Sequence, residues 1–484
     1  QAEDGIRDRS PSRGLGDVYK RQVQPTPIVL KYGDEFRSCF KDCRQFNHFR
    51  NYLTGLMVLE NKSMANIARC LLESADKTNL SRFFSESPWQ QKQINDRRVQ
   101  QMKEAVKTYR RRRDMAALII DDTLCEHAGD LFEYVARHYH HAEDRYPLSH
   151  NLVTSHYVCG QIRFPLDFLI YRRYEEQTRW EEFVKKLLPD RQIPKAKKAR
   201  QQFHKEVAPL LLLDEEFRAA HEQFKTKITL AKILLEQAID HNLSFEVVLF
   251  DGWYLAQEFV TAIELAEKDW ISVLKKNRNL EVNSFVLKDE DGKVISLPSP
   301  HIKVEELVPL IPSTAFRPIQ VKDKTYWCFS RNLAIPVLGK VRLVISFDNP
   351  QLEGNFVILI SNRLDWSAEL IVQTYLLRWP IETFYQDSKG QLGLDEYRMR
   401  TAEAFQKHWC LVFVAYSFLH LHSLELSPQK GLVLPLKTIG EVCRQQSQAL
   451  VQSLILMVHE LLNTGESVDE VFRLLLSLIH ISEP

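Results

Sequence analysis

The stretch Tyr375-Leu-Leu-Arg-Trp-Pro-Ile-Glu-Thr-Phe-Tyr-Gln-Asp-Ser-Lys389 places a phenol, two cations and an acid at helical spacing. Each residue of an α-helix turns by about 100°, so Tyr375, Arg378, Glu382 and Lys389 fall within an arc of about 60°. Pro380 disturbs the helix locally, and the arc is therefore approximate. This face is either a solvated surface with salt bridges or the setting that a divalent cation beside phosphates requires.

Two apolar runs elsewhere in the chain end in aspartates. Met115–Ile120 is followed by Asp121-Asp122-Thr123, and Phe245–Phe250 is followed by Asp251-Gly252. Carboxylates at the ends of neighbouring strands can meet in space, and clustered carboxylates repel one another unless cations neutralise them. Mg²⁺ prefers such oxygen ligands. Taken singly, each aspartate is also a common turn former at a strand end.

The rest of the chain surrounds these strands with helices. Residues 34–110 show helical spacing, and two short helices within 63–84 indicate either a helix-turn-helix-like unit or an ordinary bundle. Residues 280–362 alternate as strands do, and Ser367 is a predicted helix N-cap. A long helix is expected over Glu215–His241. We therefore predict an α/β fold, a mixed sheet with a β-rich insertion between helical regions.

The predicted division of the chain has seven parts. They are a terminal tail (1–22), a helical domain that would bind DNA if its two short helices are a helix-turn-helix (23–113), the part with the two aspartate-ended runs (114–279), the β-rich insertion (280–362), the Glu382 helix (363–400), a C-terminal helical region (401–476) and a second tail (477–484). Both tails resemble translated sequencing-adaptor sequence, and we expect no function in them.

Composition excludes several classes of protein. The 484 residues carry 64 Lys+Arg against 63 Asp+Glu, and 44% are hydrophobic, as in an ordinary globular chain. No G-x-G-x-x-G and no P-loop motif occurs, which disfavours dinucleotide and P-loop enzymes. The eight cysteines form no C-x-x-C, so a reduced cytosolic chain is expected. No apolar run reaches the roughly 18 residues of a membrane span, and we expect no membrane partner.

The spacing Tyr375-x2-Arg378-x3-Glu382-x6-Lys389 resembles the Y-(2)-R-(3)-E-(6)-K signature of bacterial insertion-sequence DDE transposases. Ile119–Thr123 and Val247–Tyr254 look like the strands that carry the first and second aspartates of that family. The long interval before Glu382 is similar to that of members with a β insertion. The resemblance covers roughly residues 35–420 and implies an RNase H-like catalytic fold.

The resemblance also implies the site. Asp122, Asp251 and Glu382 would be the catalytic carboxylates and would hold two Mg²⁺ or Mn²⁺ ions. In the family pattern the aspartate before threonine is catalytic, which gives Asp122. Strand alternation then puts Asp121 on the opposite face, where its carboxylate caps the chain locally or pairs with a basic side chain. Arg378 and Lys389 would hold phosphates of the transposon end, and Tyr375 would orient a phosphate near the cut.

Basic and aromatic residues outside the signature are further candidates for DNA contact. Two clusters suggest phosphate tracks, Arg110–Arg113 with Arg111 and Arg112, and residues 185–205 with Lys197 and Lys198. The alternative for both is a solvated surface. Trp253 would stack on an unpaired base or pack in the core. A zinc site at His138, His140 and His141 is disfavoured, because no cysteine or fourth ligand lies nearby in sequence.

The function that the resemblance implies is DNA transposition. Metal-dependent cleavage at the terminal inverted repeats would free a 3′-OH, which then attacks target DNA in a cut-and-paste reaction. The expected partners are double-stranded DNA and a second copy of the chain, in the bacterial cytoplasm and at the nucleoid. The alternatives are a transposase-derived DNA-binding protein that no longer cuts, and another RNase H-like nuclease.

Overall fold

The computed structural model describes residues 25–71, 77–282, 286–288, 291–295, 297, 299–426 and 436–478. The predicted tail 1–22 lies outside these residues, as does the part of the second predicted tail beyond Leu478. The chain divides into two compact units. The helical unit holds Gln1–Arg97, Ser388–Met399 and Glu403–Pro484, and the sheet unit holds Arg98–Asp387 and Arg400–Ala402.

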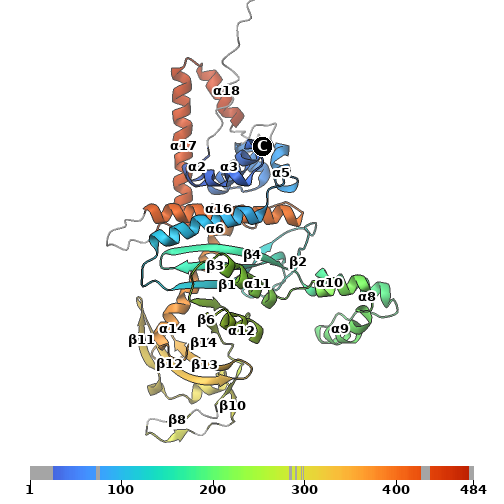
Figure 1. The fold of residues 1–484 in the computed structure, drawn as a ribbon, viewed down its shortest axis with the longest axis vertical. Coiled ribbons are helices and arrows are strands. Elements are labelled where there is room, and N and C mark those ends of the chain that lie inside the picture. The colour runs from blue at the N-terminus through green and yellow to red at the C-terminus, as the bar shows by residue number, and fades with distance from the viewer. Residues whose placement is uncertain are drawn as a thin grey trace, which may run out of the picture. The chain divides into compact units, whose positions relative to one another are not determined.

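The sheet unit is built on five central strands (Figure 1). They are β1 (Ala116–Glu126), β3 (Leu148–Cys159), β4 (Ile162–Tyr171), β5 (Val247–Phe250) and β6 (Asp269–Val273). β1 pairs antiparallel with β3, which pairs antiparallel with β4. On its other side β1 runs parallel to β5, and β5 runs parallel to β6. The predicted mixed sheet is thus confirmed, and the apolar first half of β1 is fully buried because helices cover both faces.

The β-rich insertion continues this sheet. β14 (Phe356–Ser361) pairs antiparallel with β6, and β13 and β12 follow outward. In chain order, the elements of this region before β14 are β7 (Asn279–Glu281), β8 (Leu287–Lys288), β9 (Val294–Ile295), β10 (His301–Lys303), α13 (Val304–Leu307), β11 (Arg317–Val321), β12 (Lys324–Ile335) and β13 (Gly339–Phe347). Only β8 and β9, among the described strands, form a separate two-stranded sheet. β2 (Ala136–Arg137) closes the far edge beside β3.

Helices lie on both faces of the central strands. On one face, α15 (Trp379–Gly390) contacts β3 through Phe384, whose ring centroid lies 4.5 Å from that of His156. α14 (Ala368–Tyr375) begins at the predicted N-cap Ser367, which accepts a hydrogen bond from Leu370 N. On the other face, α12 (Gln257–Leu265) packs Phe259 against Phe250 of β5, and α11 (Lys227–Asp240) packs beside α12. α6 (Gln91–Tyr109) leads into β1.

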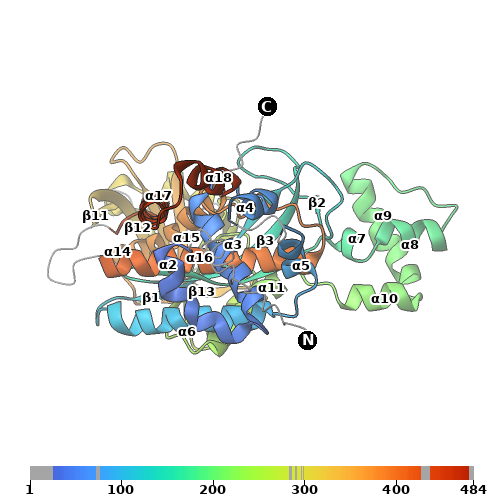
Figure 2. The same ribbon diagram turned by 90° about the horizontal axis from the view of Figure 1, so that it is seen from above.

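A helical insertion of four helices separates β4 from α11 and forms a group of its own (Figures 1 and 2). Its members are α7 (Tyr174–Gln177), α8 (Trp180–Leu187), α9 (Lys197–Leu211) and α10 (Glu215–Glu222). Its own small core is formed by Trp180, Phe183, Val184, Phe203, Val207, Leu211 and Phe217. The expectation of one helix over Glu215–His241 is wrong, because the chain breaks after α10 and Thr226 caps α11 by accepting from Thr229 N.

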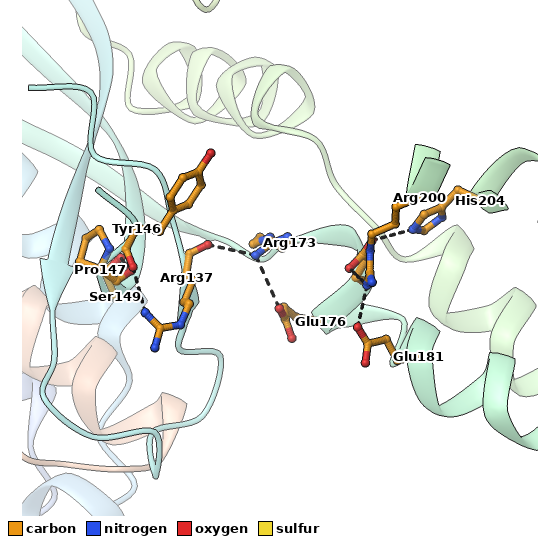
Figure 3. Close-up of polar contacts among 10 residues, drawn as sticks. Arg137, Tyr146, Pro147, Ser149, Arg173, Glu176, Glu181, Arg200 and His204 are labelled. Carbon is orange, nitrogen blue, oxygen red and sulfur yellow. Dashed lines mark hydrogen bonds and ion pairs between the residues drawn. The ribbon is translucent and has the colours of Figure 1, made fainter. Parts of the chain in front are cut away.

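Arginines fix the helical insertion at its base and inside (Figure 3). At the base, Arg173 donates to the Arg137 carbonyl at 3.1 Å and faces Glu176 at 3.9 Å. Inside, the Arg200 guanidinium joins Glu175 and Glu181, at 2.5 and 2.6 Å. Four helices too short to be stable alone are therefore held by one apolar core and one ionic network.

The helical unit combines both ends of the chain. Its helices are α2 (Pro27–Gly33), α3 (Cys43–Val58), α4 (Met64–Leu71), α5 (Lys77–Ser85), α16 (Ala402–Leu426), α17 (Ile439–Asn463) and α18 (Val468–Leu478). Phe36 of the N-terminal part packs edge-on against Phe418 of α16, with ring centroids 5.6 Å apart. Among the described helices, α16 alone is long and apolar enough to cross a bilayer, but 83% of its most apolar window is buried, as in a core helix.

Candidate active site

The aspartates of β1 and β5 lie at the same edge of the sheet. The two strands run parallel, with Ile120 opposite Phe250, and Asp121 and Asp251 each come next in sequence. Asp251 follows the end of β5, but Asp121 and Asp122 lie within β1, which continues to Glu126, so the expectation that this strand ends at the aspartates is wrong. The chain turns at once after Asp251, because the Trp253 N–H donates to the Asp251 side chain at 3.0 Å. A Cβ at Gly252 would lie 2.7 Å from the carbonyl oxygen of Val273, so only glycine fits between β5 and β6.

Asp121 points to the face of the sheet that carries α15. Its cross-strand partner Thr154 shares that face and hydrogen bonds to Tyr385 of α15 at 2.5 Å. The Arg378 guanidinium contacts the Asp121 carboxylate and lies 3.1 Å from Glu382. Burial raises the pKa of Asp121 to about 7; Arg378 opposes the shift, whereas Asp122 and Asp251 add to it. Asp121, Arg378 and Glu382 thus form one continuous ionic chain.

Asp122 points to the opposite face, which carries α11 and α12. One carboxylate oxygen accepts from Lys227 Nζ at 2.8 Å and from Asn151 Nδ2 at 3.0 Å. The other oxygen accepts from the Tyr254 hydroxyl at 2.8 Å. Burial raises the pKa of Tyr254 well above its usual value, with Asp122 and Asp121 adding to the shift, so the phenol remains a donor.

Asp251 lies within electrostatic reach of both β1 aspartates. Burial raises its pKa, the Trp253 N–H and Arg378 oppose the shift, and Asp122 adds to it. The charge of Asp251 in turn helps to raise the pKa of Asp121. The structure therefore brings Asp121, Asp122 and Asp251 together at one sheet edge, with Glu382 reached through Arg378.

The four signature residues do not share one uninterrupted helix. Tyr375 ends α14, Arg378 lies in a 3-10 turn over Leu376–Arg378, and α15 starts at Trp379 with Pro380 as its second residue. Proline is tolerated at that place because the first amides of a helix have no internal partner. Burial raises the pKa of the Tyr375 phenol, and Arg378, Asp251 and Asp121 all act on it, so Tyr375 belongs to the acidic site. Lys389 lies two turns beyond Glu382 on α15.

The two basic clusters predicted to bind DNA lie apart from the acidic edge. Arg111 and Arg112 are exposed in the turn before β1, and five strand residues, about 17 Å, separate the start of that strand from Asp121. Lys197 and Lys198 are exposed at the start of α9 in the helical insertion.

Trp253 lies beside the acidic edge and is 53% exposed, which excludes the core-packing alternative for it. The ammonium groups of Lys227 and Lys275 lie 5.7 and 5.5 Å from its ring centroid.

Three functional candidates were missed from sequence. Lys227, Tyr254 and Asn151 hold Asp122, yet only Tyr254 gave a local signal, three residues after Asp251. Lys227 stands 105 positions from Asp122 along the chain, and only the packing of α11 on the sheet brings the two together.

The donor set at the acidic edge fits a divalent metal. Carboxylate oxygens from β1, β5 and α15 are hard ligands of the kind that Mg²⁺ and Mn²⁺ accept. Their mutual effect on the pKa values of Asp121 and Asp251 shows the unfavourable charge that a cation would relieve.

A second group of ligand atoms lies within 4.8 Å of one another at Glu126, His140 and Glu143. There the Arg145 guanidinium already contacts both carboxylates, and we assign no metal to it.

Comparisons with known proteins show the family of the chain. The model of the DDE superfamily endonucleases matches residues 35–290, and the model of the transposase DDE domain matches residues 221–418. The probable transposase for insertion sequence element IS701 of Microchaete diplosiphon is 21% identical over 388 residues, 78% of this chain and 84% of that protein. The first match covers more than half of the chain, which therefore belongs to the DDE superfamily of endonucleases and is a DDE transposase.

Proposed function

We propose that the protein is the transposase of an insertion sequence that excises its element and joins it to target DNA by a cut-and-paste reaction. The observation that carries the proposal is the convergence of carboxylates from β1, β5 and α15 around Arg378. The similarity to the IS701 transposase, which spans most of both chains, supports the choice of an insertion sequence.

The metal-binding carboxylates of this proposal are Asp251, Glu382 and an aspartate of β1, for which the family pattern gives Asp122. Two Mg²⁺ or Mn²⁺ ions bound there would activate the attacking oxygen and stabilise the leaving oxygen of an in-line displacement. Asp251 is pre-positioned for this role by the Trp253 amide. Glu382 is 45% exposed, so one side of its carboxylate remains accessible.

The chain's cations and its phenol would position the DNA strand. Arg378 is fixed between two carboxylates and can turn its remaining N–H groups to a phosphate oxygen, since guanidinium carries five donors. Tyr375 stays protonated and can donate to a phosphate. Lys389 would supply a further charge along α15. In the first step water breaks the P–O3′ bond at the element's end, and in the second the freed 3′-OH displaces a 3′ oxygen of the target strand.

Contacts away from the cut would come from the exposed basic residues. Lys197 and Lys198 on the helical insertion and Arg111 and Arg112 before β1 are the proposed phosphate contacts. Trp253, exposed between two lysines, is the proposed stacking surface for a base. Because two element ends must be joined, we propose a homodimer on DNA, acting in the bacterial cytoplasm at the nucleoid.

The test is strand cleavage of the terminal repeats that flank the reading frame. We expect nicking at the repeat boundary with Mg²⁺ or Mn²⁺ and none with EDTA. Glu382→Gln should abolish cleavage and leave end binding within about tenfold, because a metal ligand contributes several kcal/mol to the transition state and little to duplex affinity. Glu369→Gln, an exposed acid on α14, is the matched control. Specific binding without cleavage by the unaltered protein would instead support a DNA-binding protein that no longer cuts.

A further inference from the structure

The two consecutive aspartates of β1 face opposite sides of the sheet, and this decides which of them can meet Glu382. Successive side chains of a strand alternate between its faces. Ile119 and Asp121 share a face with their cross-strand partners His156 and Thr154. Phe384 and Tyr385 of α15 contact those two partners, so Asp121 faces the helix that carries Glu382.

The opposite face is independently marked by α11 and α12. Ile120 pairs with Phe250, and Phe250 packs on Phe259 of α12 with ring centroids 5.1 Å apart. Asp122 shares this face, where Lys227 of α11 meets it at 2.8 Å. The face of α15 and the face of Lys227 are thus on different sides of β1.

The partners of each carboxylate agree with this division. Asp121 and Glu382 contact the same guanidinium, that of Arg378, so the two acids are neighbours on one side. Asp122 accepts three hydrogen bonds from side chains, including one from an ammonium, at 2.8 to 3.0 Å. A carboxylate has about four acceptor positions, so Asp122 has little left for a metal ion. The ammonium group of Lys227 neutralises the charge of Asp122.

We propose that Asp121, and not Asp122, completes the metal-binding set with Asp251 and Glu382, and that Asp122 is the partly buried counterion of Lys227. This inference rests on the proposed function for its metal. It gives Asp122 a separate task, because Lys227 is the first residue of α11, directly after the helical insertion returns to the sheet. The Asp122–Lys227 pair, with side chains 18% and 15% exposed, fixes that return point.

The matched pair Asp121→Asn and Asp122→Asn in the full chain tests the inference. The first readout is Mn²⁺ binding to the protein without DNA, measured from the electron paramagnetic resonance of free Mn²⁺. We expect Asp121→Asn to weaken Mn²⁺ binding by at least about tenfold, as loss of a ligand should. Asp122→Asn should leave the Mn²⁺ Kd within about threefold and should lower Tm, because Lys227 is left without its counterion.

The double variant Asp122→Asn/Lys227→Met removes both partly buried charges and keeps the test decisive if Asp122→Asn folds poorly. We expect it to regain Tm relative to Asp122→Asn and to bind Mn²⁺ as the unaltered protein does. Loss of Mn²⁺ binding in the folded double variant, or unchanged Mn²⁺ binding in Asp121→Asn, would overturn the inference. A protein that binds Mn²⁺ through Asp121 yet cleaves no terminal repeat would refute the proposed function and leave this assignment of ligands intact.

Discussion

At the scale of single residues, the site depends on which charges share a guanidinium or an ammonium. Arg378 is 17% exposed and contacts two carboxylates, whereas Lys227 is 15% exposed and contacts one. Arginine presents a planar fork of donors and lysine a point charge, so the two cations are not interchangeable here. On one face of the sheet Arg378 therefore joins Asp121 to Glu382, and on the other face Lys227 forms an ion pair with Asp122.

The Arg378→Lys variant should reduce strand cleavage by about 10- to 150-fold. The substitution keeps the charge but loses one of the two contacts to Asp121 and Glu382, and a hydrogen bond to a charged group is worth about 1.5–3 kcal/mol. The measurement is the single-turnover nicking rate on the terminal repeat. Arg363→Lys is the matched control, since Arg363 also joins two aspartates, Asp269 and Asp365, away from the site. Equal losses in both variants would show a general effect on stability instead.

At the scale of elements, the helical insertion is the part of the sheet unit with its own apolar core. Trp180 is almost fully buried there, and its ring stacks on His204 at 3.7 Å between centroids. Its basic residues gather before and along α9, while Glu175 and Glu181 are engaged by Arg200. Lys197 and Lys198 are thus exposed at the start of α9, whereas Arg200 is paired with acids of the insertion.

The Lys197→Ala/Lys198→Ala variant should weaken DNA binding to all sequences alike. Each lost phosphate contact lowers the slope of log K against log salt by about 0.9, so we expect a decrease of up to about 1.8. Filter binding of a terminal repeat and of an unrelated duplex over a range of salt concentrations measures the slope. Lys322→Ala/Lys324→Ala is the matched control, since Lys322 lies in the turn before β12, Lys324 is the first residue of that strand, and both are exposed. An unchanged slope would assign these lysines to the solvated surface.

At the scale of the whole molecule, the helical unit is closed by segments from both ends of the chain. His408 of α16 is buried and donates from Nε2 to the Gly393 carbonyl at 3.0 Å, so its Nδ1 accepts from the Tyr52 hydroxyl at 2.8 Å. Both nitrogens of the neutral ring are satisfied, and protonation would break the bond to Tyr52 unless that hydroxyl turned away. The contact joins α3 to α16 across more than 350 residues of sequence.

Acid should destabilise the helical unit through His408. Burial lowers the pKa of His408 from about 6.5 to about 4 in the folded state. Between these values the unfolded chain takes up a proton that the folded chain refuses, so stability falls as pH drops from about 6.5 to 4. At about 1.4 kcal/mol for each unit, the loss approaches about 3 kcal/mol. Calorimetry across this range should show a flatter Tm profile for His408→Gln than for the unaltered protein. His459 is exposed on α17, and the Tm profile of His459→Gln should match that of the unaltered protein.

The sequence by itself determined the parts of this protein that depend on local pattern. Apolar runs followed by aspartates predicted the first half of β1 and all of β5, the Ser367 cap predicted the start of α14, and alternation predicted strands in the insertion. The spacing of Tyr375, Arg378, Glu382 and Lys389 matches the family signature, and this match indicated the family although the four residues do not share one uninterrupted helix.

Only the tertiary structure decided which helices, and therefore which cations, Asp121 and Asp122 contact. Alternation placed Asp121 and Asp122 on opposite faces, but it could not say which face α15 would cover. That choice depends on contacts to β1 from Lys227 of α11 and from Arg378 before α15, which lie 105 and 257 positions from their partners in the chain. Such packing is set by the burial of apolar surface and not by local propensity. The break before Thr226 and the continuation of the insertion into the central sheet were decided in the same way.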